Sequence, residues 1–375
     1  MTRHVIRAAA CTAALVLGLA APRHARAQVP AHGVGAAAGL EHYIFGDDDA
    51  AGIRSLSLFT APFAVRVAFA PATLELAGAF ARGALTRPDG SSATITGLTD
   101  TSLRLGVPVV RDRLTLFGAV VLPTGQARQT LEEAEVAGAI AADLLPFRVS
   151  NWGTGGGVDV SVALALPVSG FGVGLRLGYA LAREFEPLEE QDFTYQPGDQ
   201  FYAGLAVDRV IGYAGKASVQ LTYQRFQDDA LGGRNLYRAG DRVQLVGSYA
   251  FAVGAASSGV AYAGVMHRSR GAYIGSTGEA PAQDLILAGG GIRIPTARAL
   301  LLPGADLRIF RSADGVGQGY VIGLGGSVEL PLGTGGLLLV PNVRGRLGKL
   351  LVREGSESGF TGFEIGAGLR WGGRP

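Results

Sequence analysis

The sequence predicts an all-β protein: a closed antiparallel transmembrane β-barrel of about 16 strands, with 14 strands as the alternative. Three observations lead to this fold class. Apolar residues alternate with small or polar residues over many segments of about ten residues, the length of a tilted strand that crosses a bilayer. Of the 375 residues, 48% are hydrophobic, 17% are charged and 58 are glycine, which excludes disorder and suits helices poorly. Short turns alternate with long polar segments, as in bacterial outer-membrane barrels.

Residues 1–27 have the composition of an export signal. Two arginines give a basic start, residues 8–21 form an apolar run, and Ala25-Arg26-Ala27 is a cleavage site of the small-x-small type. The run is too short to span a membrane as a helix. We therefore predict a cleaved signal peptide at 1–27, a mature barrel at 28–375 and a location in the bacterial outer membrane. Cleavage removes four of the 33 basic residues and leaves 29 against 31 acidic ones, so the charge gives no indication of nucleic-acid binding.

The alternating segments follow one another along the whole mature chain. We predict strands near 33–44, 53–69, 72–84, 95–108, 113–123, 157–167, 171–183, 199–211, 216–227, 241–253, 259–269, 284–295, 299–311, 317–330, 337–351 and 361–371. The even count is the rule in bacterial barrels and places both termini on the periplasmic side.

The segment 171–183 shows why a membrane barrel is preferred to a soluble sandwich. One face carries only large apolar residues, from Phe171 to Leu181, and the other carries glycine, alanine and Arg176. A lipid-facing surface must be apolar, whereas the inside of a barrel accepts small or polar side chains. Arg176 is predicted to point inward, since an arginine on the lipid face costs roughly 2–4 kcal/mol at the bilayer midplane.

Two further features fit a membrane barrel. Tyrosines recur near predicted strand ends, as in an interfacial aromatic girdle: Tyr43, Tyr179, Tyr213, Tyr249 and Tyr273. The last strand, from Phe363 to Trp371, is amphipathic and closes on an aromatic residue, which resembles the assembly signal of outer-membrane proteins. We expect outer-membrane lipid as one partner and the assembly machinery, through Phe363 to Trp371, as another.

Charged residues of both signs fall on the inward-facing positions. The residues predicted to line the interior are Arg104, Asp159, Arg176, Arg293, Arg308, Glu329, Arg344, Arg346, Glu364 and Arg370, and Glu75, Asp100 and Asp306 share their parity. The signs nearly balance, which predicts weak ion selectivity because strong selectivity needs rings of one charge. The alternative is that these residues are ion pairs that hold the barrel in shape.

The longest external segment, 124–156, contains a helix signal. Thr130 and Glu133 form a capping-box pattern, Val136 and Ile140 repeat at helical spacing, and Pro146 ends the run. This helix could fold into the mouth of the barrel or lie on its rim, and the rim is favoured because folding inward needs contacts that a sequence does not reveal.

Three stretches carry a family resemblance: GLTDTSLRLGVPVV (97–110), LFGAVVLPTG (116–125) and GTGGGVDVSVALALP (153–167). Together they resemble outer-membrane barrels of the phenol-degradation meta-pathway, or transporter-like, family. Thr99 stands where that family usually has glycine. The resemblance implies uptake of small, often aromatic or apolar compounds and brings no catalytic residues.

We therefore predict a porin-like diffusion channel or uptake conduit for a small-molecule permeant, with no cofactor and no enzymatic activity. A structural or adhesive barrel is one alternative. A barrel-based hydrolase is another, and it needs a base beside a nucleophile. His267 is predicted to face inward, and its inner neighbours Ala261, Ala263 and Val265 provide neither nucleophile nor carboxylate. No cysteine remains in the mature chain and no paired histidines suggest a metal site.

Overall fold

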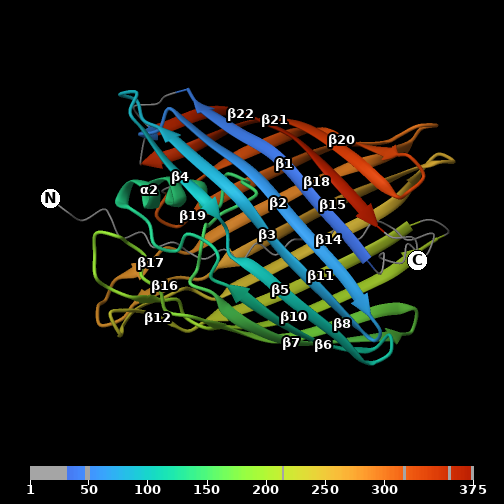
Figure 1. Cartoon of the computed structure of the whole chain (residues 1–375), viewed down its shortest axis with the longest axis horizontal. Helices are drawn as coiled ribbons and strands as arrows, with labels where there is room; N and C mark the ends of the chain where they lie inside the picture. The colour runs from blue at the N-terminus through green and yellow to red at the C-terminus, as the bar shows by residue number, and fades with distance from the viewer. Residues whose placement is uncertain (1–31, 47–50, 213–214, 316–317, 354–355, 373–375) are drawn as a thin grey trace.

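The computed structural model describes residues 32–46, 51–212, 215–315, 318–353 and 356–372, so the predicted signal peptide lies outside the described residues. The described strands form one closed antiparallel barrel with 16 wall positions (Figure 1). The wall consists of β1 (His32–Phe45), β2 (Ser55–Phe69), β3 (Ala72–Thr86), β4 (Ser92–Leu98) with β5 (Thr101–Val110), β6 (Leu114–Leu122), β7 (Gly157–Val168), β8 (Phe171–Ala182), β10 (Gln200–Ile211), β11 (Gly215–Phe226), β14 (Arg242–Val253), β15 (Ser257–Arg268), β18 (Gln283–Pro295), β19 (Leu300–Ser312), β20 (Gly319–Leu332), β21 (Leu337–Arg353) and β22 (Ser356–Gly372).

Closure comes from pairing between the first and last strands. β1 and β22 are antiparallel neighbours from Gly33 opposite Gly372 to Phe45 opposite Phe360. This pairing removes the two open sheet edges, whose backbone groups would otherwise lack partners. The predicted fold class and strand count are confirmed.

The strand boundaries agree with the alternation except in two places. The predicted strand 95–108 is two strands, because β3 pairs first with β4 and then with β5, and Thr99 and Asp100 lie between them. The predicted long loop at 352–360 is wrong, since β21 and β22 continue as a paired ladder to Arg353 opposite Ser356.

The outer face of the barrel is a belt of exposed apolar side chains. Leu175, Leu205, Leu221 and Leu245 are successive partners on β8, β10, β11 and β14, and their exposed fractions are 45%, 39%, 40% and 44%. Large contiguous apolar surfaces are rare on soluble monomers and typical of proteins embedded in lipid.

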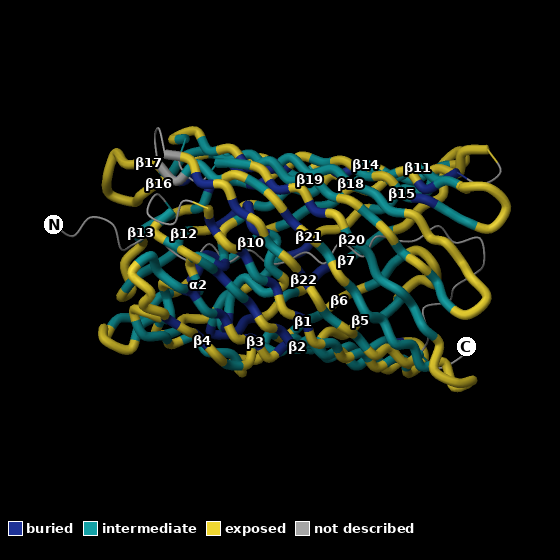
Figure 2. Tube along the Cα trace, turned by 90° about the horizontal axis from the view of Figure 1, so that it is seen from above, coloured by how far each residue is buried: buried dark blue, intermediate teal, exposed yellow. Residues whose placement is uncertain are grey.

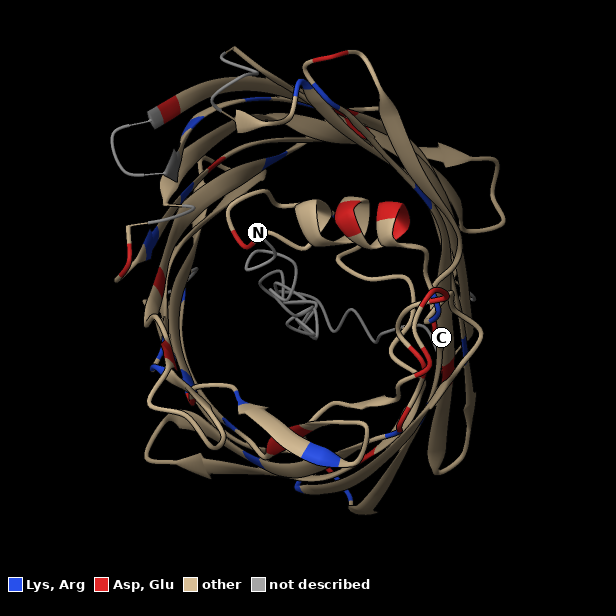
Figure 3. Cartoon of the chain, turned by 90° about the vertical axis from the view of Figure 1, so that its left-hand side faces the viewer, with Lys and Arg blue, Asp and Glu red and all other residues tan. Residues whose placement is uncertain are grey.

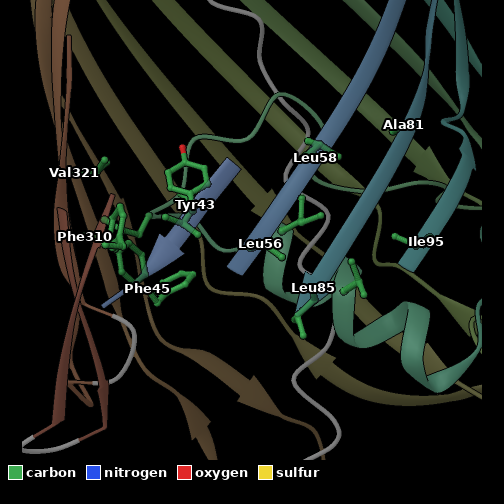
Figure 4. Close-up of a cluster of buried hydrophobic side chains, with 14 of the residues drawn as sticks. Tyr43, Phe45, Leu56, Leu58, Ala81, Leu85, Ile95, Phe310 and Val321 are labelled. Carbon is green, nitrogen blue, oxygen red and sulfur yellow. The ribbon is translucent and has the colours of Figure 1, made fainter. Parts of the chain in front are cut away.

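The buried side chains lie on the opposite, inner face. A cluster joins Leu56, Leu58 and Ile95 to the long segment between β6 and β7 (Figure 4). Many buried positions lie in the half of the barrel that contains this segment (Figure 2). Tyr43 belongs to this inner cluster, so its predicted place in an outer aromatic girdle is wrong; Tyr213 lies outside the described residues.

The two ends of the barrel differ. Turns such as 169–170 and 333–336 close one end, whereas long segments extend from the other. At the long-loop end a second, five-stranded sheet is formed by β9 (Tyr195–Gln196), β12 (Asp228–Leu231), β13 (Arg234–Arg238), β16 (Gly271–Tyr273) and β17 (Glu279–Ala280). In the described part of the chain, no helix has the length and apolarity needed to cross a membrane.

Candidate functional site

The segment 124–156 folds into the barrel and carries the helix α2 (Leu131–Ile140). Viewed along the barrel, α2 lies inside the ring of strands (Figure 3). The predicted capping box is present: Glu133 N donates to Thr130 Oγ1 at 3.2 Å, and Thr130 N donates to Glu133 Oε2 at 3.0 Å. The helix is therefore where the sequence predicts it, but the favoured rim placement is wrong.

The inner face of β2, β3 and β4 explains the inward placement. Val136 and Ile140 of α2 are fully buried against this face. Gly83 of β3 leaves the necessary room, because a Cβ atom there would lie 2.6 Å from Ile140 Cδ1 and 2.9 Å from the ring of Trp152. Trp152 Nε1 donates to the carbonyl of Ala81 at 3.1 Å. Burial of Val136 and Ile140 against the apolar inner face of β2, β3 and β4 stabilises the helix inside the barrel.

Asp100 fastens both ends of the segment at its neck. Its Oδ1 accepts from Gly125 N at 3.0 Å, and its Oδ2 accepts from Thr154 N at 2.6 Å and Thr154 Oγ1 at 2.8 Å. The start and the end of the segment are in close contact there, since a Cβ on Gly153 would lie 2.7 Å from Ala127 N. The three sequence stretches that carry the family resemblance thus meet at one place, the neck of the inserted segment.

The far end of the segment is anchored by a buried network of charges. The Arg148 side chain is ion-paired with Glu364, and Arg148 N donates to Glu41 Oε2 at 3.0 Å. Arg346 Nη2 donates to Glu364 Oε2 at 2.8 Å and also pairs with Glu41. Asn342 Nδ2 donates to Glu364 Oε1 at 2.8 Å, and Arg346 Nη1 donates to Tyr43 Oη. Two guanidiniums and two carboxylates balance here, as a buried ionic cluster requires.

Other predicted lining residues form hydrogen bonds and ion pairs on the same side of the barrel as this network. Arg308 Nη1 donates to the carbonyl of Asp143 at 3.3 Å, so it contacts the inserted segment directly. Arg344 is ion-paired with Asp306 across β20, where Gly323 leaves space for the carboxylate. Near the short-turn end, Arg370 Nη2 pairs with Glu329 Oε1 at 3.1 Å.

The opposite wall carries a different group of predicted residues. β8 and β21 are eight positions apart in the 16-position ring, so Arg176 lies across the barrel from Arg346. Tyr202 Oη donates to Asp159 at 2.8 Å, and Arg176 Nη2 donates to Ser161 Oγ at 3.0 Å. The guanidinium of Arg176 lies 5.2 Å from the ring centroid of Tyr202 and 5.5 Å from that of Phe117. We call Phe117, Asp159, Ser161, Arg176 and Tyr202 the wall cluster.

The remaining predicted residues stand apart from both groups. Arg104 of β5 is the register partner of Glu75, whose carboxylate accepts from Arg66 Nε at 3.0 Å. Arg293 is the register partner of Ser258 near the short-turn end. The ten predicted residues are thus divided among an anchor of the inserted segment, a wall cluster and scattered positions.

The predicted inward placement of His267 is wrong. Its neighbours Met266 and Arg268 are buried on the inner face, whereas Val265 is exposed on the outside with His267. His267 Nδ1 lies 2.8 Å from Asp284 Oδ1 on β18. The two faces of the whole strand were exchanged in the prediction, because Ala261, Ala263 and Val265 are exposed on the outside together with His267. The inner face of β15 carries Tyr262 and Met266 and is apolar as well, so side-chain polarity did not distinguish the two faces. No group of metal-binding side chains is found among the residues that the structure describes.

No family model matches the chain, and no curated protein matches it either. Among solved structures, a triple mutant of the Rhodopseudomonas blastica porin has 14% identity and a TM-score of 0.40, covering 91% of this chain and 99% of that chain. A bacterial polysaccharide outer membrane secretin has 10% identity and a TM-score of 0.46, covering 90% and 98%. At these identities the likeness concerns the fold alone, and the specific family resemblance stays a prediction.

Proposed function

We propose that this chain is an outer-membrane channel through which small solutes pass by diffusion, with the segment 124–156 narrowing the passage. The observation that carries the proposal is the contrast between the two faces of a closed barrel. The outer face is a belt of exposed leucine and valine, whereas β11 presents Ser218, Gln220, Thr222 and Gln224 inward. Lipid outside and water inside is the arrangement that suits both faces.

The inserted segment lies against the strands from β15 through β1 to β4, which leaves the wall from β6 to β14 as the open side of the passage. The wall cluster is on that open side. Charges of both signs occur there, so we expect weak ion selectivity.

We propose aromatic solutes with a polar substituent as the permeants. The guanidinium of Arg176 and the rings of Phe117 and Tyr202 offer flat surfaces on which a planar ring stacks. Asp159 and Ser161 offer hydrogen bonds at the edge of the same surface. The polar surroundings favour such solutes over purely aliphatic ones. The proposed permeants are therefore a smaller class than the aromatic or apolar compounds that the family resemblance implies.

The test is the conductance of the mature chain, residues 28–375, in planar lipid bilayers. A shortened variant replaces residues 128–152 by a short glycine-serine linker, which the close contact between Ala127 and Gly153 permits. We expect steady conductance from the full chain and a several-fold larger conductance from the shortened variant. Phenol is expected to reduce the current more than cyclohexanol, and the difference is expected to shrink in Arg176→Gln but not in Arg104→Gln.

Heat-modifiable migration on gels verifies that each variant is folded before it is measured. Folded protein that never conducts would overturn the channel proposal. Conduction by the shortened variant alone would also overturn passive diffusion, because the segment would then be a closed plug. Equal effects of phenol and cyclohexanol would overturn the aromatic preference alone.

A further inference from the structure

Two adjacent buried arginines lie on the inner face at the long-loop end. Arg242 of β14 and Arg268 of β15 are direct register partners, and their exposed fractions are 6% and 8%. Three of their nitrogens, Arg242 Nε, Arg242 Nη2 and Arg268 Nε, are buried and have no hydrogen-bond partner among the described residues. Arg242 Nη1 has a long contact of 3.5 Å with Gln224 Oε1.

Unpartnered donors of this kind require an explanation. Burying a guanidinium without compensating acceptors is costly, and nearly all buried polar atoms in proteins have partners. A buried N–H without a protein acceptor is a donor available to a bound ion or water molecule. The three donors here belong to two neighbouring side chains on the same face of the sheet.

The charge around the pair is unbalanced. The carboxylate of Asp143, in the inserted segment, interacts with the charges of both Arg268 and Arg308. Two guanidiniums thus share this carboxylate, and no ion pair of Arg242 is found among the described residues. The anchor around Glu41 and Glu364 shows the contrast, because there two guanidiniums meet two carboxylates.

We propose that Arg242 and Arg268 form a binding site for an oxyanion, the carboxylate or sulfate-like group of a small water-soluble solute. Both side chains lie on the inner face of the barrel, so a lipid headgroup at the outer surface does not reach them. Planar guanidiniums bind such groups through paired, charge-assisted hydrogen bonds. The ring of Phe226 lies 5.9 Å from the Arg242 guanidinium and adds an aromatic surface beside the anion.

The proposal of a binding site does not depend on transport. The role of this site as the first one that an entering solute contacts rests on the proposed function. Its position fits that role, since both arginines lie where the inner wall meets the long-loop segments. Tyr237 of the five-stranded sheet at the long-loop end is close enough to Arg268 to interact with its charge. The site is therefore bounded by the barrel wall, the inserted segment and this five-stranded sheet.

The experiment is equilibrium binding to the detergent-solubilised mature chain by isothermal titration calorimetry. Sodium sulfate, sodium benzoate and neutral benzyl alcohol are the probes, which separates an inorganic anion from an aromatic carboxylate and from an uncharged ring. Arg242→Gln and Arg268→Gln remove one guanidinium each, and Arg242→Lys retains the charge without the planar fork. Arg293→Gln is the matched control, because it removes an inner arginine far from the pair.

We expect saturable binding of at least one anion and none of benzyl alcohol at the same concentration. Each Gln variant is expected to weaken binding by about tenfold or more, the size of one charge-assisted hydrogen bond. Arg242→Lys is expected to bind with intermediate affinity, and Arg293→Gln like the unmodified chain. Absence of saturable anion binding would overturn the inference, because the donors would then be satisfied by water. Equal weakening by Arg293→Gln would overturn it as well. Anion binding by a chain that does not conduct would leave this site intact and overturn only the proposed function.

Discussion

Asp143 is the residue on which the charge of the proposed anion site depends. Its carboxylate interacts with the charges of Arg268 and Arg308, and we expect it to compete with an incoming anion for the Arg268 guanidinium. Asp143→Asn keeps the shape of the side chain and removes its charge. We expect this variant to bind sulfate several-fold more tightly, and calorimetry with Asp314→Asn, a carboxylate in the β19–β20 loop, as the control measures the difference. Unchanged affinity would mean that Asp143 does not face the anion.

The pH dependence of the same residue has a defined sign. Burial raises the pKa of Asp143, while the guanidiniums of Arg268 and Arg308 oppose that effect. The folded protein therefore holds this proton to a higher pH than the unfolded chain does. Its contribution to stability is present at low pH and is lost as the pH rises through the raised pKa. Sulfate keeps its charge over this range, so we expect sulfate affinity to rise as the pH falls toward the ordinary Asp value of about 4. In Asp143→Asn the affinity is expected to be flat.

Arg346 carries the largest energetic weight in the anchor. It is 9% exposed and serves both Glu41 and Glu364. Arg346→Met leaves two buried carboxylates without that partner, which costs about 3–5 kcal/mol for a broken buried pair. We expect faster hydrogen exchange at residues 146–149 and a lower thermal midpoint. Arg370→Met is the control: it breaks the exposed pair with Glu329, worth about 1 kcal/mol or less. Equal effects of the two variants would contradict the buried anchor.

At this scale the alternation of residue types predicted which charged side chains face inward, but not what they do there. Arg346 and Glu41 are 305 positions apart in sequence, and Arg148 and Glu364 are 216 apart. Periodicity reports the face of a strand, not the side chains that meet it from neighbouring strands at the closure of the barrel or from the inserted segment. Glu41 and Tyr43 were missed for this reason, although both share the inward parity of the strand 33–44.

At the scale of elements, the helix was predictable and its location was not. The capping box and the Val136–Ile140 spacing are local signals. The location depends on what the inner wall offers, and a signal for it was present in the sequence. Leu56, Leu58 and Ile95 occupy inward positions, and large apolar side chains there would face water if the channel were open at this wall. An apolar patch inside a barrel indicates that a segment of the same chain covers it.

Gly83→Val tests this packing. The added side chain would meet Ile140, Trp152 and Val136 together, at Cβ distances of 2.6, 2.9 and 3.1 Å. Overpacking of this kind costs about 1–3 kcal/mol, and we expect the helix to move away from the wall. The expected result is noisier and altered channel conductance with an intact barrel. Gly174→Val is the control on the open wall, where a Cβ meets Ala206 Cβ at an ordinary 3.7 Å. Identical currents from both variants would place α2 elsewhere.

For the molecule as a whole, the two faces of the barrel determine its environment. The alternation predicted both faces and the strand count, since each strand repeats the same pattern and backbone pairing forces closure. Strand ends were harder, because polarity changes there for reasons unrelated to the side on which a residue lies. The hairpin of β21 and β22 therefore extends further than the sequence indicated. His267 was assigned to the wrong face for a different reason: both faces of β15 carry apolar residues, so the alternation did not show which face is the outer one.

Neighbouring residues in the middle of β11 provide a test of the whole arrangement. Leu221 is exposed on the outer belt between Leu205 and Leu245, while Gln220 points inward between Ala206 and Val246. In a bilayer, Leu221→Lys places a charge in lipid at a cost of roughly 2–4 kcal/mol, whereas Gln220→Lys places the same charge in water. We expect the first variant to fold into lipid vesicles with a much lower yield and a lower denaturation midpoint, and the second to fold almost normally. In addition, Gln220→Lys is expected to shift the reversal potential toward anions, which Leu221→Lys is not. If both lysines were tolerated equally, the outer belt would not be in contact with lipid, and the barrel would belong to a different environment.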